Sequence, residues 1–197
     1  MVYTSYMPKI VNHEERKTSI AKATWKVIAR DGLRGATVRS IAKEANLSLG
    51  AVRYYFNTQE ELIVFAMELV EQQVNERIAE HLQKPLPMKQ MIVAILLELV
   101  PISEQHMIEM QVWLEFISYK VRNGERAEEN MLIGMHNIFS YLQQANLLRE
   151  GLVVQDEIQH LYAFIDGLAL HVFMGLVPMD KSRIQLLIEK EIDKLLN

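Results

Sequence analysis

The chain contains no cysteine among its 197 residues. Disulfide bonds and thiolate metal sites are therefore excluded, and a reducing compartment suits the protein. Glycine and proline are scarce, at 8 and 5 residues, and no segment shows the period-two alternation of a half-buried strand. Half of the residues are hydrophobic, which is enough to bury a sizeable core in a chain of this length. The composition predicts an all-α protein.

Long hydrophobic runs are also missing. The most apolar segment, residues 161–179, is interrupted by Asp166, His171 and Pro178, so we expect no membrane span. The first residues, MVYTSYMPKIV, show no basic region followed by an apolar run, so we expect no signal peptide. Together these features predict a cytoplasmic protein.

The residue patterns of catalytic and metal sites are missing as well. The six histidines are scattered, and the single Glu-x-x-His motif at residues 157–160 is only part of what a di-iron helical bundle needs. No glycine-rich phosphate loop and no nucleophile elbow is present. We therefore expect no catalytic residue, no metal and no cofactor, and we predict that the chain is not an enzyme.

Charge is distributed unevenly along the chain. The formal net charge is −4, which by itself argues against general affinity for nucleic acid. Residues 1–57, however, hold ten Lys or Arg and four Asp or Glu, a net of +6, while the remaining residues carry a net of −10. A basic segment on an acidic body is typical of a DNA-reading module, and the acidic part discourages non-specific coating of DNA.

The segment at residues 37–61, TVRSIAKEANLSLGAVRYYFNTQEE, has the pattern of two short helices, a tight turn and the start of a third helix. Thr37 is suited to cap the first helix and Ser48 the second. Asn46 in the turn tolerates left-handed backbone dihedrals. The third helix begins at Thr58, with Glu61 at the position of a capping-box carboxylate. This order is typical of a helix-turn-helix.

The second short helix, from Leu49, has the features of a recognition helix. Gly50 and Ala51 are small enough to let the backbone enter a major groove, and Arg53 can bond guanine O6 and N7. Tyr54 can reach a phosphate or a thymine methyl group. An isolated arginine on a helix is usually only solvated. The residue type alone therefore leaves open whether Arg53 contacts DNA.

Residues 20–62 resemble the DNA-binding domain of the TetR family of bacterial transcriptional regulators. The resemblance is carried by Gly32, Ala36-Thr37, Ile41-Ala42, Ala45, Leu47-Ser48, Gly50, Tyr55-Phe56 and Leu62. It implies that the following residues face bases: Arg39, Leu49, Ala51, Arg53 and Tyr54. Gly50 belongs to the predicted DNA-binding surface as the small residue that lets the backbone approach. It also implies that a second set positions the DNA backbone: Thr37, Ser48, Tyr55, Thr58 and Gln59. The chain departs from the family at Arg53, where Tyr is usual, and at Gln59, where Lys is usual.

The hydrophobic periodicity predicts about nine helices in two domains. The first long helix is expected from Asn12, and the two short helices follow it. The remaining helices are expected at residues 58–82, 88–100, 103–121, 125–146, 154–176 and 180–196. We expect an N-terminal arm and DNA-binding domain at residues 1–57 and a helical effector-binding and dimerisation domain at residues 58–197.

The middle of the second domain is rich in methionine and aromatic residues, which can adapt to an apolar ligand. The candidate effector-binding residues are Met107, Met110, Trp113, Phe116, Met131, Met135, His136 and Phe139. The alternative is that they form ordinary core. The resemblance to the TetR family implies an effector inside this helical body.

The last two predicted helices are candidates for a dimer interface, because the first is apolar around most of its circumference. The candidate interface residues are Leu161, Ile165, Leu168, Val172, Ile184, Leu187, Ile188, Ile192 and Leu195. Resemblance to the family implies a homodimer with a C2 axis. The Asp166-Gly167-Leu168 run and the helix containing Trp113 also resemble the choline-responsive betaine-synthesis repressor branch of the family.

We therefore predict a homodimeric, ligand-responsive transcriptional regulator, most simply a repressor, that binds a near-palindromic double-stranded operator. Its two recognition helices must be spaced by about 34–36 Å, or a matching multiple, to read one face of the duplex. A small-molecule effector is expected to shift the helix that begins at Thr58. Two other classes remain open: a non-specific architectural DNA-binding protein, and a helical small-molecule carrier or enzyme.

Overall fold

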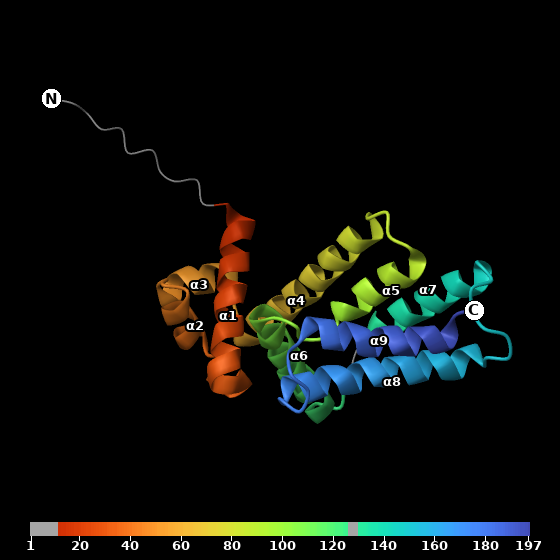
Figure 1. The fold of residues 1–197 in the computed structure, drawn as a ribbon. Coiled ribbons are helices and arrows are strands. Elements are labelled where there is room, and N and C mark those ends of the chain that lie inside the picture. The colour runs from red at the N-terminus through yellow and green to blue at the C-terminus, as the bar shows by residue number, and fades with distance from the viewer. Residues whose placement is uncertain (1–11, 126–129) are drawn as a thin grey trace. The chain divides into compact units, whose positions relative to one another are not determined.

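The structure is a computed structural model that describes residues 12–125 and 130–197. Within these residues the chain forms nine helices and no strand apart from one isolated bridge between Leu148 and Leu196, which confirms the all-α prediction (Figure 1). The helices are α1 (His13–Gly35), α2 (Val38–Glu44), α3 (Leu49–Tyr55), α4 (Gln59–Leu82), α5 (Met88–Leu97), α6 (Glu104–Arg122), α7 (Asn130–Gln144), α8 (Val154–Phe173) and α9 (Lys181–Leu195). None of these described helices is long and apolar enough to cross a membrane.

The helix ends differ from the predicted ones where the backbone changes conformation. Helix α8 ends at Phe173 rather than at residue 176, because Gly175 adopts a left-handed φ of 72° and the Leu176 amide bonds back to the His171 carbonyl. Helix α5 ends three residues early, at Leu97, where the hydrogen bonds tighten to an i to i−3 pattern. The predicted start of α7, at residues 125–129, lies largely outside the described residues.

The chain divides into two compact units, and the division falls after Leu69, inside α4. The sequence predicts a domain boundary before residue 58. The structure instead includes the first turns of α4 in the N-terminal unit. These turns are needed there because Leu62 and Ala66 are fully buried in that unit.

The core of the N-terminal unit is built by α1, α2, α3 and the beginning of α4. Its fully buried side chains come from every one of these helices and include Ile20, Val27, Ile41, Val52 and Leu62. The Trp25 indole Nε1 donates a hydrogen bond of 2.7 Å to the Ala66 carbonyl, which joins α1 to α4. Helix α1 is kinked at Gly32, whose φ of 69° is a left-handed conformation that glycine adopts without a steric penalty.

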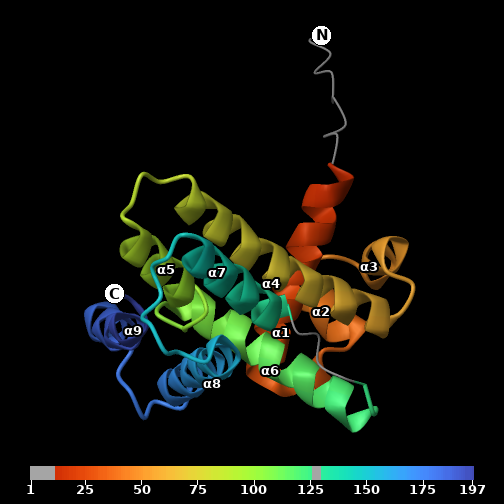
Figure 2. The same cartoon turned by 90° about the vertical axis from the view of Figure 1, so that its right-hand side faces the viewer.

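The C-terminal unit has one hydrophobic core. Helix α9 packs against α5 and α8, and α8 packs against α7 (Figures 1 and 2). Leu96, Phe139, Ile165 and Ile188 are each at most 1% exposed in this core. Beside it, the Arg149 amide donates to the Leu195 carbonyl at 2.8 Å and fixes the end of α9.

Most of the candidate dimer residues are buried within the single chain. Eight of the nine side chains are at most 7% exposed within the single chain, and they belong to its own core: Leu161, Ile165, Leu168, Val172, Ile184, Ile188, Ile192 and Leu195. Leu187 is half-buried against the same cluster. Other helices of the same chain cover these faces, so the eight buried side chains stabilise the chain's own core, and their part in a dimer interface stays a prediction.

Candidate nucleic-acid interface

The turn between α2 and α3 is fixed by short-range hydrogen bonds. The Thr37 hydroxyl accepts from the Ser40 amide at 3.1 Å and starts α2. Asn46 adopts a left-handed φ of 56°, and the Leu47 amide donates to the Ala42 carbonyl at 2.9 Å. The Ser48 hydroxyl then accepts from the Ala51 amide at 3.0 Å and starts α3. These contacts form the helix-turn-helix that the sequence predicted.

Burial separates the inner and outer faces of α3. Val52 is 0% exposed, and Phe56, directly after the helix, is 2% exposed, so both belong to the core. Gly50, Arg53 and Tyr54 are exposed, and Tyr54 is 75% exposed.

The remaining candidate DNA contacts surround this outer face. Arg39 on α2 is exposed, whereas Leu49 and Ala51 at the start of α3 are half-buried. Tyr55 is also half-buried, and its ring contacts the rings of His13 and Tyr54 at centroid distances of 4.7 and 5.0 Å.

Three candidate phosphate contacts are hydroxyl residues that already serve as helix caps. Besides Thr37 and Ser48, the Thr58 hydroxyl accepts from the Glu61 amide at 3.0 Å, while Glu61 accepts from the Asn57 amide at 2.9 Å. A hydroxyl that accepts from an amide still has its own hydrogen to donate. Capping and phosphate binding are therefore compatible at these residues. Gln59, the first residue of α4, lies next to the last of these caps and is half-buried.

Gly50 is not required by the packing of the chain. A Cβ atom added there would meet only the Ser48 hydroxyl oxygen, at an ordinary contact distance of 3.9 Å. Glycine in a helix is less favourable than alanine by roughly 1 kcal/mol. Gly50 therefore does not help the helix to fold. It does allow another molecule to approach the exposed face of α3 closely.

One arginine of the basic segment is engaged within the protein. Arg30 on α1 donates to Asp31 and, at 3.0 Å, to Glu44 on α2. These hydrogen bonds raise the pKa of Arg30, and the bond from Arg30 lowers the pKa of Asp31. Arg30 thus joins two helices, while Lys22, Lys26 and Lys43 extend into solvent.

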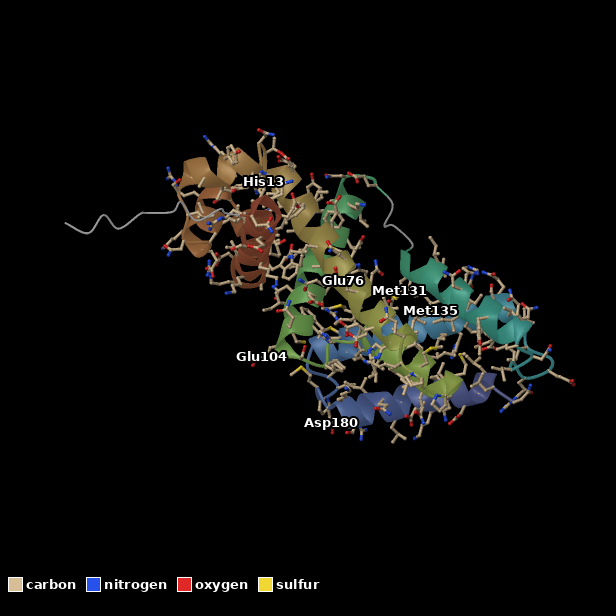
Figure 3. All side chains as sticks on the ribbon, turned by 90° about the horizontal axis from the view of Figure 1, so that it is seen from above. His13, Glu76, Glu104, Met131, Met135 and Asp180 are labelled. Carbon is tan, nitrogen blue, oxygen red and sulfur yellow. The ribbon has the colours of Figure 1, made fainter. Side chains whose placement is uncertain are left out.

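The candidate effector residues of the C-terminal unit fall into two groups. Met135 and Phe139 are 1% exposed and belong to the core, with Met110 and Met131 at its margin. Met131 and Met135 both lie on α7 (Figure 3). Phe116 is 9% exposed, and the half-buried members of the set are Met107, Trp113 and His136. A separate open hollow in the N-terminal unit, lined by Lys22, Lys26 and Glu44 among others, is charged and does not suit an apolar effector.

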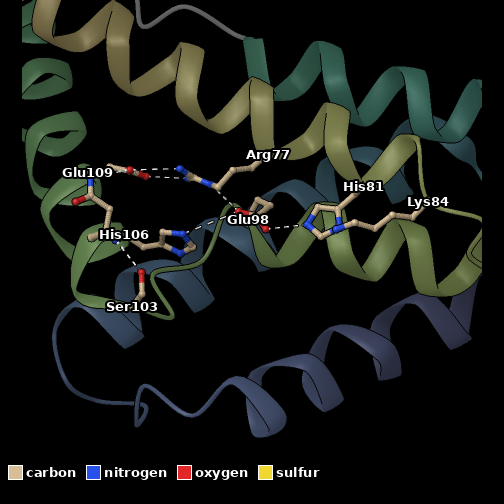
Figure 4. A network of polar contacts seen from close by, with 8 residues as sticks. Arg77, His81, Lys84, Glu98, Ser103, His106 and Glu109 are labelled. Carbon is tan, nitrogen blue, oxygen red and sulfur yellow. Dashed lines mark hydrogen bonds and ion pairs between the residues drawn. The ribbon is translucent and has the colours of Figure 1, made fainter. Parts of the chain in front are cut away.

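The C-terminal unit also contains a polar network that the sequence reading missed. Arg77 on α4 donates to Glu98, the residue that follows α5, at 2.7 Å and to Glu109 on α6 at 2.8 Å (Figure 4). His81 Nε2 lies 2.9 Å from Glu98, and His106 Nε2 lies 3.9 Å from the same carboxylate. In the sequence, the network is indicated only by Glu98 and Glu109, two acidic residues in otherwise apolar surroundings.

The network perturbs its ionisable groups in opposite directions. Burial alone would raise the pKa of Glu98, but hydrogen bonds from His81 and Arg77 outweigh it, so this pKa lies below its usual value. Burial opposes the charge of Arg77, yet Glu109 and Glu98 raise the pKa of the guanidinium. Glu109 is only 5% exposed, so its charge is held inside the protein by Arg77 and by Gln105, which donates at 3.0 Å.

A helix-turn-helix with an open recognition face, followed by a separate helical unit, defines the class of DNA-binding transcriptional regulators. The family model described as "Bacterial regulatory proteins, tetR family" matches residues 20–64, and the model "BetI-type transcriptional repressor, C-terminal" matches residues 88–197. The chain belongs to the TetR family of bacterial transcriptional regulators, which is a family of DNA-binding proteins and not of enzymes. Both resemblances seen in the sequence are thereby confirmed.

Relatives match along nearly the whole chain. The HTH-type transcriptional regulator PksA of Bacillus subtilis is 42% identical over 96% of this chain and 94% of its own length. The HTH-type transcriptional regulator BetI of Vibrio campbellii is 26% identical over 96% of both chains. A transcriptional regulator from Saccharomonospora viridis, solved in complex with choline, has the same fold with a TM-score of 0.78 at 19% identity, covering 93% of this chain and 99% of that one.

We predict that Glu98→Gln destabilises the protein by about 1–3 kcal/mol at pH 7, because it weakens the buried contacts to Arg77 and His81. Since the folded-state pKa of Glu98 is lowered, its stabilisation is complete above the ordinary value of about 4.5 and is lost as the pH falls through the lowered pKa. Urea unfolding measured from pH 7 to pH 3 should show that the free energies of unfolding of the wild-type protein and of Glu98→Gln become equal in acid. The exposed Glu76→Gln serves as control, and an equal difference at all pH values would contradict the prediction.

Proposed function

We propose that this regulator is a ligand-responsive repressor that binds a near-palindromic DNA operator as a homodimer in the cytoplasm and is released by a small-molecule effector. The observation that carries the proposal is the outer face of α3, where Arg53 and Tyr54 are exposed on a helix that Ser48 caps and Val52 anchors. An anchored helix with an open polar face is what reading of a major groove requires.

The candidate contacts divide into two roles under this proposal. Arg53, Tyr54 and Arg39 reach base edges, with Leu49 and Ala51 at the margin of the groove. Gly50 lets the backbone approach closely. The capping hydroxyls of Thr37, Ser48 and Thr58 donate to phosphates, together with the Tyr55 hydroxyl and the Gln59 amide. The exposure of Arg39, Arg53 and Tyr54 supports the first role, and the place of the three hydroxyls at helix N-termini supports the second.

A second candidate function is non-specific architectural binding of DNA. The basic N-terminal segment would suit it, but the net charge of −10 over the rest of the chain opposes broad coating of a polyanion. Exposed Arg53 and Tyr54 favour reading of bases. The experiment that separates these functions is selection of bound duplexes from a random pool, followed by competition with unrelated DNA at a stated salt concentration. An enriched inverted repeat is expected, and a specific-to-random affinity ratio near unity would refute the proposal.

The effector is proposed to bind in the C-terminal unit. The related Saccharomonospora viridis regulator was solved with choline, and another solved structure of similar fold, with a TM-score of 0.72, concerns control of antibiotic production by bacterial hormones. In this chain the half-buried Met107, Trp113 and His136, with Met110 and Met131 at the core margin, are best placed to adapt to a ligand. The coupling to DNA needs to be only ~1–3 kcal/mol.

The dimer is proposed to form through the outer face of α8. Ala163, Gly167, Leu170 and Met174 recur there at helical spacing, and all are exposed or half-buried. An added Cβ at Gly167 would meet no described atom within 4 Å, so glycine is not needed there by the chain itself. A small residue in an apolar stripe instead allows a second helix to approach closely, as a C2 interface between two copies of α8 requires.

We predict that Arg53→Ala relaxes the preference at one position of each operator half-site by ~1–3 kcal/mol, because a bidentate base contact is lost. Tyr55→Phe should instead weaken binding to all DNA sequences alike, since it keeps the ring but removes the hydroxyl that we propose donates to a DNA phosphate. Affinity for a panel of single-base operator variants measures both effects. A uniform loss from Arg53→Ala would show that this arginine contacts phosphate.

We predict that Gly167→Leu shifts the protein from dimer to monomer without unfolding it, because the new side chain fills space that a second α8 would occupy. Gly134→Leu is the matched control: Gly134 is also a helical glycine on which an added Cβ would meet no described atom within 4 Å. Sedimentation velocity at micromolar concentration reports the oligomeric state, and circular dichroism reports folding. A stable dimer of Gly167→Leu would move the interface off this face of α8.

A further inference from the structure

The first residue of α1, His13, lies against two candidate DNA-contacting residues of α3. Its ring centroid is 4.7 Å from that of Tyr55 and 6.1 Å from that of Tyr54. The Tyr54 and Tyr55 rings are themselves 5.0 Å apart and nearly perpendicular, at 87°. The three rings therefore form one cluster, which joins the start of α1 to the end of α3.

This cluster belongs to a longer row of contacts along α1. Lys17, one helical turn after His13, places its ammonium group 5.6 Å from the centroid of the Phe65 ring. Phe65 in turn packs against Phe56 at 5.3 Å. The first two turns of α1 thus contact aromatic residues of α3 and α4. The contact between Lys17 and Phe65 therefore helps to fix the start of α1, and with it the position of His13.

The cluster bears on recognition because Tyr54 is 75% exposed. A side chain that projects into solvent samples several rotamers, and ordering it on DNA costs conformational entropy. Edge-to-face packing against neighbouring rings restricts those rotamers before DNA arrives. Of the ring contacts seen around Tyr54, one comes from its neighbour Tyr55 and the other comes from His13.

We propose that His13 is a positioning residue for operator recognition, which holds the Tyr54 and Tyr55 rings in the orientation that DNA requires. The proposal rests on the proposed function, because it assumes that α3 reads the operator. His13 acts through the two tyrosines and needs no contact of its own with DNA.

The charged groups around His13 favour this role over direct binding of a phosphate. The carboxylate of Glu14 on the same helix lies 3.5 Å from His13 Nδ1, and the groups that face the ring from α3 are the two tyrosines. A carboxylate next to the imidazole repels a DNA phosphate. The ring surface, rather than a positive charge, is what His13 offers to α3.

The test compares operator affinity for the full-length protein and three single variants. His13→Ala should bind the selected operator roughly three- to tenfold more weakly, because the tyrosine rings must be ordered on binding. His13→Phe should restore wild-type affinity, since it keeps a ring of similar shape. Tyr141→Ala, which removes an exposed ring from α7, is the control and should leave affinity unchanged. Circular dichroism confirms that each variant is folded.

A double-mutant cycle decides whether His13 acts through Tyr54. In a Tyr54→Ala background, His13→Ala should cost much less than it does in the wild-type protein. Full additivity would overturn the proposal. So would failure of His13→Phe to rescue binding, because phenylalanine keeps the ring surface but lacks the imidazole N–H groups that a direct contact with phosphate would use. If the wild-type protein selects no operator, the proposed function itself has failed, and this outcome is distinct.

Discussion

The structure depends on one constraint: α4 is a single continuous helix that supplies buried residues to both compact units. In its first turns, Leu62 and Ala66 complete the core of the DNA-binding unit, and the Ala66 carbonyl accepts the Trp25 hydrogen bond. In its later turns, Arg77 is held by two glutamates of the C-terminal unit. Neither unit is complete without its part of this helix.

The Arg77 network shows how the C-terminal unit holds α4. Taking a guanidinium and two carboxylates out of water is costly, so such a cluster is a weak source of net stability. Its geometric demands are strict, however, because Arg77 must meet Glu98 at the end of α5 and Glu109 on α6 at the same time. Under the proposed function, an effector that moves α5 relative to α6 cannot leave all of these bonds intact, and α4 must respond.

Local features of this fold could be predicted from the sequence, while long-range ones could not. Ser48 and Thr58 act on amides three residues away, and Asn46 bends its own backbone, so their roles follow from residue type and spacing. Arg77 meets partners 21 and 32 residues away, which no local pattern reveals. Periodicity showed that α9 has an apolar stripe at Ile184, Ile188 and Ile192, but it could not show that the same chain covers it.

The position of the DNA-reading helix α3 depends on the side chains that it buries in the N-terminal unit. Helix α3 has only seven residues, fewer than an isolated helix needs to be stable in water. It exists because Val52 and Phe56 are buried under it and Ser48 caps it, so its direction is set by the core. The backbone direction of α3 thus comes from its inner face, whereas its exposed side chains are free to vary without loss of fold. Arg53 sets the chemistry of the outer face while buried Val52 keeps the helix in place.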